Sequence, residues 1–162
     1  MDQARILIVD DDDIARKNLS RILQKEGFEV ATAKTGSAAL ERLSDSACDL
    51  VMTDLVMEDL NGLELLARIK NQYPYMEVIL ITGYASIPTA IEAIKTGAYH
   101  YIEKPIRPAE MVHLARQAIE KKRLREQVVK LEARIKGDLE EPVLIGQSRK
   151  MVEVTKLIKQ IA

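Results

Sequence analysis

The sequence predicts a doubly wound α/β fold, in which a five-stranded parallel sheet is covered by helices on both faces and followed by a long C-terminal helix. Three short runs are almost wholly apolar, as strands buried on both faces of a parallel sheet must be: Arg5–Val9, Leu50–Met52 and Val78–Ile81. Two weaker runs, Phe28–Ala33 and Tyr99–Glu103, predict further strands. A helical pattern lies between each strand and the next, and this alternation is typical of α/β proteins.

The first two helices are expected directly after the first two strands. Asp12 or Asp13 can cap the first helix, because a carboxylate accepts hydrogen bonds from the free N–H groups at a helix start. Gly27 ends this helix, since glycine readily adopts the left-handed conformation found after a helix. Ser37–Leu43 predicts a second, shorter helix.

The third and fourth helices follow the two later apolar strands. Gly62–Gln72 predicts the third helix, which ends before Pro74. Ser86 caps the fourth helix and Gly97 ends it. The apolar stripe of this fourth helix consists of Ile87, Ile91 and Ile94.

The fifth helix is expected to continue as a coiled-coil dimerisation linker over residues 108–136. No proline or glycine interrupts it after its first residue, and four apolar residues recur at spacings of four, three and four: Leu124, Val128, Leu131 and Ile135. This spacing is typical of the a/d seam of a dimeric coiled coil. Because the seam covers only about two heptads, a solvated helix with a weak apolar stripe is the alternative.

Composition excludes several classes of protein. The 162 residues carry a formal net charge of −1, which does not indicate a globally basic nucleic-acid binder. The single cysteine, Cys48, cannot form an internal disulfide. No apolar run is long enough to span a membrane, and the first residues do not form a signal peptide. We therefore expect a cytoplasmic protein that does not associate with membranes.

Charge is distributed unevenly along the chain. Residues 1–106 have a net charge of −6, residues 107–136 have a net charge of +5, and residues 137–162 are balanced. This division predicts an acidic globular part, a basic helical arm and a short tail.

Polar side chains follow four of the predicted strands at the point where each strand ends. The first strand is followed by Asp10–Asp13, the third by Asp54, the fourth by Thr82 and the fifth by Lys104. Because the carboxyl ends of parallel strands meet at one edge of a doubly wound sheet, we expect these side chains to share one pocket.

Such a pocket suits a divalent cation and a phosphoryl group. Neighbouring carboxylates repel each other, and Mg²⁺ relieves the repulsion while keeping coordination positions for phosphate oxygens. Asp54 is the expected nucleophile that becomes an acyl phosphate, and Lys104 spreads the charge of the transition state. Each residue alone has a simpler explanation: a helix cap for Asp12 and Asp13, a turn for Asp54 and a surface position for Lys104. Their occurrence together at successive strand ends favours the phosphoryl site.

These motifs resemble those of the response regulator receiver domain, the CheY-like, flavodoxin-like fold of two-component signalling. The matching segments are Ile6–Asp11, Thr53–Met57 with Asn61 and Gly62, Ile81–Gly83 and Tyr101–Pro105. The resemblance covers residues 4–121 and implies the strand order 2-1-3-4-5. It also implies that a sensor histidine kinase phosphorylates Asp54.

The resemblance implies a set of metal ligands. Mg²⁺ would be bound directly by Asp11 and Asp54 and by the main-chain carbonyl of Val56, and Asp10 would assist. The sequence departs from the family at Glu58, where the family usually has proline. Because proline stiffens a loop, we expect a more mobile loop here.

The resemblance also implies a switch. Thr82 would bond to a phosphoryl oxygen, Lys104 would pair with the phosphoryl group, and Tyr101 would change rotamer as Thr82 moves. A cis peptide bond between Lys104 and Pro105 is a further expectation.

The last 26 residues, 137–162, resemble a second family. Residues 137–142 predict a linker, and the following segments are similar to the first residues of the AAA+ ATPase domain of sigma-54-dependent, NtrC-type activators: Leu144–Ser148, Met151 and Ile158–Ala162. No Walker motif or helix-turn-helix is present. We therefore expect an N-terminal fragment that is not itself an enzyme and reaches sigma-54 RNA polymerase and DNA only through missing C-terminal domains.

The functional hypothesis is a phosphorylation-dependent switch that acts as a homodimer. Phosphorylation of Asp54 is expected to shift the dimer between pairing through the arm at residues 108–136 and pairing through the fourth and fifth helices of the receiver, and so to control a downstream ATPase. Two alternatives stay open. One is a pure dimerisation module with a vestigial acidic pocket, and the other is a Mg²⁺-dependent phosphohydrolase with an aspartyl nucleophile.

Overall fold

A computed structural model describes residues 3–140 of the chain. The chain divides into two compact units, of which the first ends at Ile119 and the second begins at Glu120, close to the predicted limit of the receiver at residue 121. The prediction that an AAA+ domain starts in the last residues lies outside the described residues. Within residues 3–140, no helix is long and apolar enough to cross a membrane.

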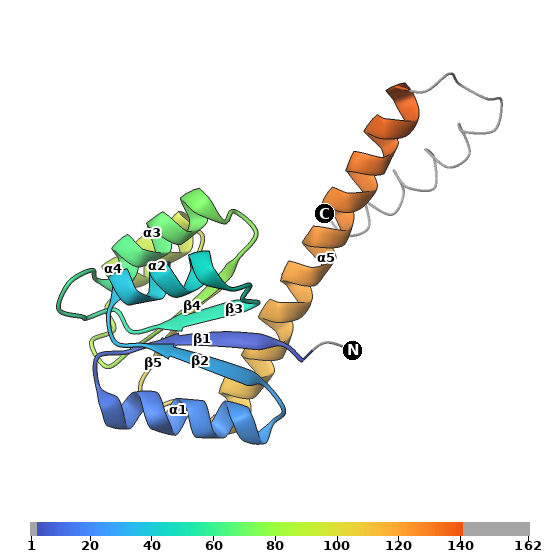
Figure 1. The fold of residues 1–162 in the computed structure, drawn as a ribbon. Coiled ribbons are helices and arrows are strands. Elements are labelled where there is room, and N and C mark those ends of the chain that lie inside the picture. Colours follow the sequence, from blue (N-terminus) through green and yellow to red (C-terminus); the bar gives the residue numbers. More distant parts are fainter. Residues whose placement is uncertain (1–2, 141–162) are drawn as a thin grey trace. The chain divides into compact units, whose positions relative to one another are not determined.

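Five parallel strands form one sheet in the order β2-β1-β3-β4-β5 (Figure 1). Their bounds are β1 Arg5–Val9, β2 Glu29–Ala33, β3 Leu50–Thr53, β4 Glu77–Thr82 and β5 His100–Glu103. The central strands β1, β3 and β4 are almost entirely buried, which explains why their sequences are continuous apolar runs. The predicted strands and strand order are confirmed.

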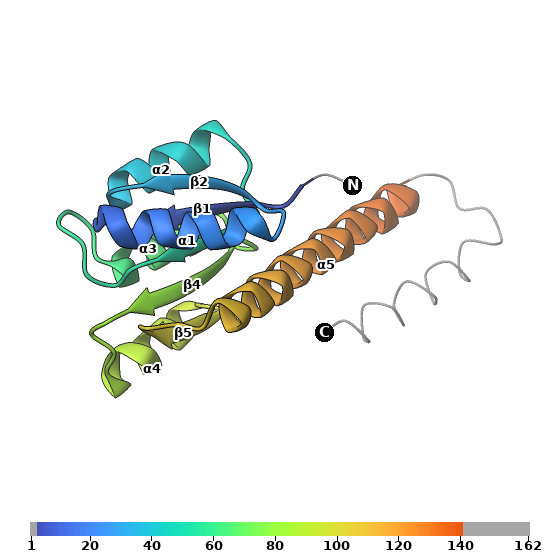
Figure 2. The same ribbon diagram turned by 90° about the horizontal axis from the view of Figure 1, so that it is seen from below.

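Helices cover both faces of this sheet. Their bounds are α1 Asp13–Lys25, α2 Gly36–Asp45, α3 Gly62–Gln72, α4 Ile87–Thr96 and α5 Pro108–Glu140. Figure 1 shows α2, α3 and α4 on one face, and Figure 2 shows α1 and the first turns of α5 on the other. The doubly wound fold with a long C-terminal helix is confirmed.

Each face of the sheet has its own hydrophobic core. Side chains alternate along a strand, so Leu7 and Val9 of β1 face the α2 and α3 side, while Ile6 and Ile8 face the α1 and α5 side. The helices fill the two cores with fully buried residues such as Leu65, Leu66 and Ile69 on one side and Leu23 and Met111 on the other.

Helix ends agree with the prediction except in two helices. Asp12 caps α1, as one of the two predicted candidates. Thr35 caps α2, which extends one residue before and two residues after the predicted Ser37–Leu43. α5 continues through Gly137 to Glu140, four residues beyond the predicted end of the fifth helix at residue 136. A glycine inside a helix costs only about 1 kcal/mol relative to alanine, so it does not necessarily end one.

The apolar stripe of α4 faces away from the core. Ile87, Ile91 and Ile94 are 77%, 50% and 54% exposed, whereas Ala93 is fully buried. The spacing of the isoleucines predicted the helix correctly, but the side of α4 that packs inward is built from small residues. The larger side chains are therefore left on its surface.

Candidate functional site

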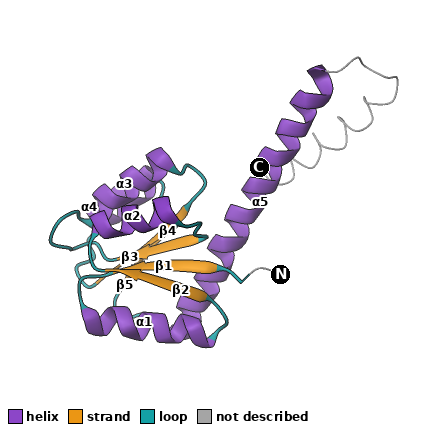
Figure 3. Cartoon of the chain, viewed as in Figure 1, coloured by secondary structure: helices purple, strands orange, loops and turns teal. Residues whose placement is uncertain are grey.

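The candidate site lies at the edge of the sheet where the strands end. All strands run parallel, so their carboxyl ends point the same way, and the loops that follow them gather at this edge (Figure 3). The structure brings four of the predicted side chains together here: Asp10, Asp11, Asp54 and Lys104.

Three carboxylates form the acidic cluster of this site. One carboxylate oxygen from each of Asp10, Asp11 and Asp54 lies within 4.8 Å of the others. Asp10 is only 1% exposed, and its Oδ1 accepts a hydrogen bond of 2.9 Å from the backbone N–H of Asp12, which fixes its orientation. Negative charges this close destabilise one another unless a cation lies between them.

Lys104 supplies such a cation from the end of β5. Its Nζ donates hydrogen bonds to Asp10 Oδ2 at 3.0 Å and to Asp54 Oδ2 at 3.3 Å. Burial by itself lowers the pKa of Lys104, but the hydrogen bond with Asp10 and the charges of Asp10 and Asp54 outweigh burial and raise the pKa above its ordinary value. The ammonium group therefore stays charged at neutral pH and is shared by two carboxylates. The peptide bond between Lys104 and Pro105 is cis, as expected.

Asp54 is held firmly at the end of β3. Its backbone N–H donates to Val9 O at 2.9 Å, and its Oδ1 accepts a hydrogen bond of 2.7 Å from the N–H of Leu55. Gly62 N–H donates to Leu55 O at 2.7 Å and closes the following loop. A Cβ atom at position 62 would lie 2.4 Å from the carbonyl oxygen of Asp54, so only glycine permits this close approach.

Thr82 and Tyr101 are both tied to the segment that begins α4. Thr82 is fully buried at the end of β4, and its Oγ1 accepts a hydrogen bond of 3.0 Å from the N–H of Tyr84. The hydroxyl of Tyr101 lies 2.7 Å from Thr89 Oγ1 and accepts a hydrogen bond of 3.4 Å from the N–H of Ser86. Tyr101 therefore rests against the start of α4, and Thr82 against the loop that precedes this helix.

The loop that follows Asp54 carries a residue that sequence reasoning missed. Val56, the predicted carbonyl ligand, is 50% exposed in this loop. Asp59 Oδ1 and Oδ2 accept hydrogen bonds from the N–H groups of Gly36 at 3.1 Å and Ser37 at 3.0 Å. Hydrogen bonding, first with the Ser37 side chain and then with backbone N–H groups, holds the pKa of Asp59 well below its usual range.

The predicted dimer seam lies on α5 in the second unit. Leu124 is 38% exposed, and the other three residues of the seam are partly buried: Val128, Leu131 and Ile135. Their spacing on a continuous helix places all four residues on one face.

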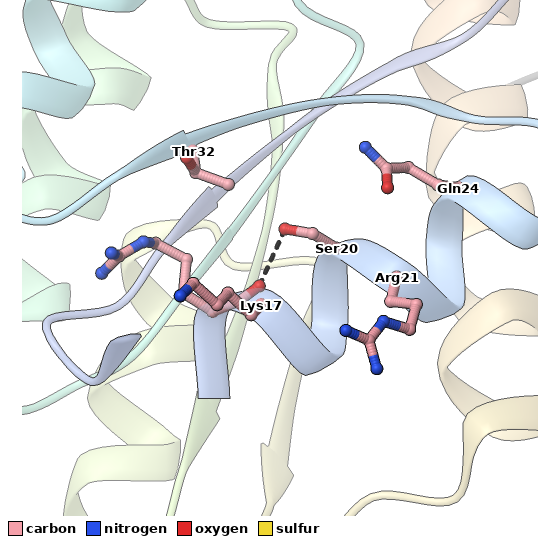
Figure 4. A pocket seen from close by; sticks show the side chains of 6 residues that line it. Lys17, Ser20, Arg21, Gln24 and Thr32 are labelled. Atoms are coloured by element: carbon pink, nitrogen blue, oxygen red, sulfur yellow. Dashed lines mark hydrogen bonds between the residues drawn. The ribbon is translucent and has the colours of Figure 1, made fainter. Parts of the chain in front are cut away.

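A separate cavity of about 320 Å³ lies between α1 and β2 (Figure 4). Polar and basic side chains line it: Arg16, Lys17, Ser20, Arg21, Gln24 and Thr32. Ser20 Oγ donates a hydrogen bond of 2.7 Å to the Arg16 carbonyl at its wall. None of the predicted site residues lines this cavity, so it is distinct from the acidic cluster.

The chemistry of the acidic cluster fits Mg²⁺. All of its side-chain donors are carboxylate oxygens, which are the hard ligands that Mg²⁺ prefers, and they lie close enough to share one ion. Asp10, Asp11 and Asp54 are the described residues that could hold the ion.

Comparison with known proteins gives a family and close relatives. The model of the response regulator receiver domain family matches residues 6–116. A putative NtrX-like response regulator of Rickettsia bellii is 36% identical over 145 residues, which are 88% of this chain and 30% of the relative. The C4-dicarboxylate transport transcriptional regulatory protein DctD of Rhizobium meliloti is 34% identical over 157 residues, which are 97% of this chain and 34% of the relative. The chain thus spans about a third of these curated relatives.

A solved structure of similar fold is the beryllofluoride-activated NtrC4 receiver domain dimer. It has a TM-score of 0.70 and 36% sequence identity, and the match covers 73% of this chain and 98% of that one. The likeness therefore extends over the whole of a receiver domain.

Proposed function

Because the chain belongs to the response regulator receiver domain family, we propose that it is a Mg²⁺-dependent phosphorylation switch that accepts a phosphoryl group on Asp54 from a sensor histidine kinase. The observation that carries this proposal is the ammonium of Lys104 shared between Asp10 and Asp54. A cation placed between a buried carboxylate and the proposed nucleophile is what transfer of a negatively charged group to Asp54 requires.

The proposed reaction transfers the phosphoryl group from a phosphohistidine. A carboxylate oxygen of Asp54 attacks the phosphorus, the new O–P bond forms as the P–N bond breaks, and the electron pair of the broken bond stays with the imidazole nitrogen. Lys104, whose Nζ donates a hydrogen bond to Asp54 Oδ2, would donate hydrogen bonds to the phosphoryl oxygens and stabilise their charge. Mg²⁺ held by Asp10, Asp11 and Asp54 would supply positive charge that offsets the charge on these oxygens.

The proposed switch begins at Thr82. A phosphoryl group on Asp54 adds charge and new acceptor oxygens, which draw the Thr82 hydroxyl away from the N–H of Tyr84. The movement leaves space that Tyr101 can fill, and Tyr101 then gives up its hydrogen bond with Thr89. Because Thr89 lies in the first turn of α4, the change is passed to that helix.

We propose that the output of the switch is a change in dimer geometry. Two surfaces support this: the apolar seam of α5 and the exposed isoleucines of α4. In one state the coiled arm at residues 108–136 sets the pairing, and in the other the fourth and fifth helices of the receiver do. In the full-length protein this change would control a sigma-54-dependent ATPase in the cytoplasm, and through it sigma-54 RNA polymerase and DNA.

Small-angle X-ray scattering with and without beryllofluoride and Mg²⁺ tests this output. We expect a dimer in both states, with a different distance distribution when Asp54 carries the phosphate mimic. The variant Asp54→Ala, which cannot hold the mimic, serves as the control and should give the same curve in both conditions. Identical dimer geometry with and without the mimic in the unaltered protein contradicts the proposed output.

Slow loss of the phosphoryl group is a second expected property. Val56 lies two residues beyond Asp54, and Tyr84 lies two residues beyond Thr82. Both residues are strongly exposed, at 50% and 75% respectively. Neither side chain is suited to position an attacking water, because one is apolar and the other bulky. We expect the double variant Val56→Asn with Tyr84→Ala to dephosphorylate about tenfold faster, because the asparagine amide can hold the attacking water through one hydrogen bond, worth about 1 kcal/mol. Decay of the isolated phosphoprotein measures the rate, and an unchanged rate contradicts this role.

The two alternatives predict different results. A phosphohydrolase turns over phosphate esters continuously, whereas the proposed receiver accepts one phosphoryl group per chain. A pure dimerisation module does not react with a small phosphodonor such as acetyl phosphate in the presence of Mg²⁺. Stoichiometric labelling without turnover of esters supports the receiver function against both.

A further inference from the structure

We propose that Asp59 is a positioning residue for phosphorylation, because its carboxylate ties the loop that carries Val56 to the N-terminus of α2. This loop, the phosphoacceptor loop, comprises residues 55–61. The inference rests on the proposed function of Asp54 and adds a residue to its machinery. In this role Asp59 touches no reacting atom and acts through the loop.

Asp59 completes the hydrogen bonding of a helix that lies more than 20 residues away in the sequence. The N-cap Thr35 accepts a hydrogen bond from the N–H of Ala38 at 3.1 Å, as N-caps usually do. The first two N–H groups of α2, those of Gly36 and Ser37, instead donate to the two oxygens of Asp59. A negative charge at a helix N-terminus is also favoured by the helix dipole. The helix start therefore binds the loop through a carboxylate that uses both of its oxygens.

Close packing next to Asp59 makes this contact specific. Leu60 is 8% exposed and lies directly against the start of α2. A Cβ atom at position 36 would lie only 2.6 Å from Leu60 Cβ, so glycine at this position lets the loop and the helix approach each other. Asp59 and Leu60 together dock the loop on α2, one by charge and one by apolar contact.

In the middle of the phosphoacceptor loop Met57 is anchored in the hydrophobic core, being only 8% exposed, but the loop has few restraints besides this one. Its two ends are joined by the hydrogen bond from Gly62 N–H to Leu55 O, but Val56 is 50% exposed and Glu58 is exposed. Glu58 stands where a proline would fix the backbone φ angle. The contact between Asp59 and the start of α2 supplies a restraint on the loop that Glu58 does not supply.

The test compares Asp59→Ala with Glu58→Ala, a matched control that removes the neighbouring exposed carboxylate. Amide hydrogen exchange is measured by NMR on the metal-free protein. We expect exchange at Gly36, Ser37 and Val56 to become several-fold faster in Asp59→Ala only. Amides of the central strands should be unchanged in both variants, which shows that the fold is intact. Should Asp59→Ala fail to fold, Asp59→Asn keeps one acceptor oxygen and should give an intermediate effect.

A Mg²⁺ titration followed by NMR then separates positioning from mere helix capping. We expect Mg²⁺ affinity to fall about three- to tenfold in Asp59→Ala, as the loss of one or two hydrogen bonds allows. Adding Glu58→Pro to Asp59→Ala should recover part of the affinity, because proline restrains the loop independently. The contrary result is faster exchange at Gly36 and Ser37 with unchanged exchange at Val56 and unchanged Mg²⁺ affinity. It would show that Asp59 only caps α2, and it would overturn the inference.

The two proposals fail in different ways. If the unaltered protein takes no phosphoryl group from acetyl phosphate, the proposed function is wrong, while loop exchange and Mg²⁺ affinity still decide the role of Asp59 in shaping the metal site. If the unaltered protein is phosphorylated and Asp59→Ala has the same loop exchange and the same Mg²⁺ affinity, the inference about Asp59 is wrong and the proposed function stands.

Discussion

Replacing Asp54 with asparagine is expected to abolish phosphorylation by acetyl phosphate in the presence of Mg²⁺. The amide is a far weaker nucleophile than the carboxylate and also removes one charge from the acidic cluster, so both the attack and the metal site are impaired. The measurement is the intact mass of the protein after incubation. The unaltered protein should gain one phosphoryl group, and Asp54→Asn should gain none.

The control for this prediction is an exposed aspartate outside the acidic cluster. Asp45, at the end of α2, is exposed, and Asp45→Asn should take up the phosphoryl group as fast as the unaltered protein. If the Asp54→Asn variant gains a phosphoryl group at the normal rate, the acceptor is another residue. That result would contradict the assignment of Asp54.

Replacing Lys104 with methionine is expected to lower both the stability of the metal-free protein and its rate of phosphorylation. The substitution leaves Asp10, only 1% exposed, and Asp54 without the ammonium that they share. Removing one partner of a largely buried charged pair costs about 2–3 kcal/mol. Mg²⁺ supplies the missing positive charge, so adding Mg²⁺ should raise the unfolding midpoint of Lys104→Met more than that of the unaltered protein.

A surface lysine on the same rim provides the matched control. Lys34 Nζ lies 3.7 Å from Asp13 Oδ1, and both side chains are more than half exposed. Such pairs contribute about 0–1 kcal/mol, so Lys34→Met should unfold at nearly the same urea concentration as the unaltered protein. Equal stability losses in Lys104→Met and Lys34→Met would mean that the acidic cluster does not depend on Lys104.

The sheet and the cluster of strand-end residues were predictable because both follow from patterns within a few residues. Fully buried parallel strands must be continuously apolar, and parallel strands must end at one edge. These two facts are sufficient to predict that Asp10, Asp54 and Lys104 lie together at one edge of the sheet, as their hydrogen bonds show. The agreement reflects strong physical constraints on a sheet covered on both faces.

The roles of Asp59 and Thr89 could not be predicted in the same way. Asp59 binds the start of a helix 22 and 23 residues earlier, and Thr89 meets Tyr101 across 12 residues. Both contacts depend on how a loop or helix packs, and a single carboxylate or hydroxyl carries no periodic signal. The missing proline at Glu58 predicted only a more mobile loop and did not point to Asp59.

The orientation of α4 could not be predicted from the spacing of its apolar residues either. A stripe of isoleucines at helical spacing identifies a helix, but it does not say whether the stripe meets the core or solvent. In this chain the small Ala93 packs inward, so the isoleucines are available for a partner surface. Such an exposed apolar face is expected where a helix takes part in an interaction.

The most direct test of the central claim is a crystal structure of the protein with Mg²⁺ and beryllofluoride. We predict one Mg²⁺ bound by Asp11, Asp54 and the Val56 carbonyl, with beryllofluoride on an Asp54 oxygen and its fluorides contacted by Lys104 and Thr82. A structure in which the beryllofluoride attaches to another carboxylate, or in which the Lys104 ammonium points away from it, would contradict the account.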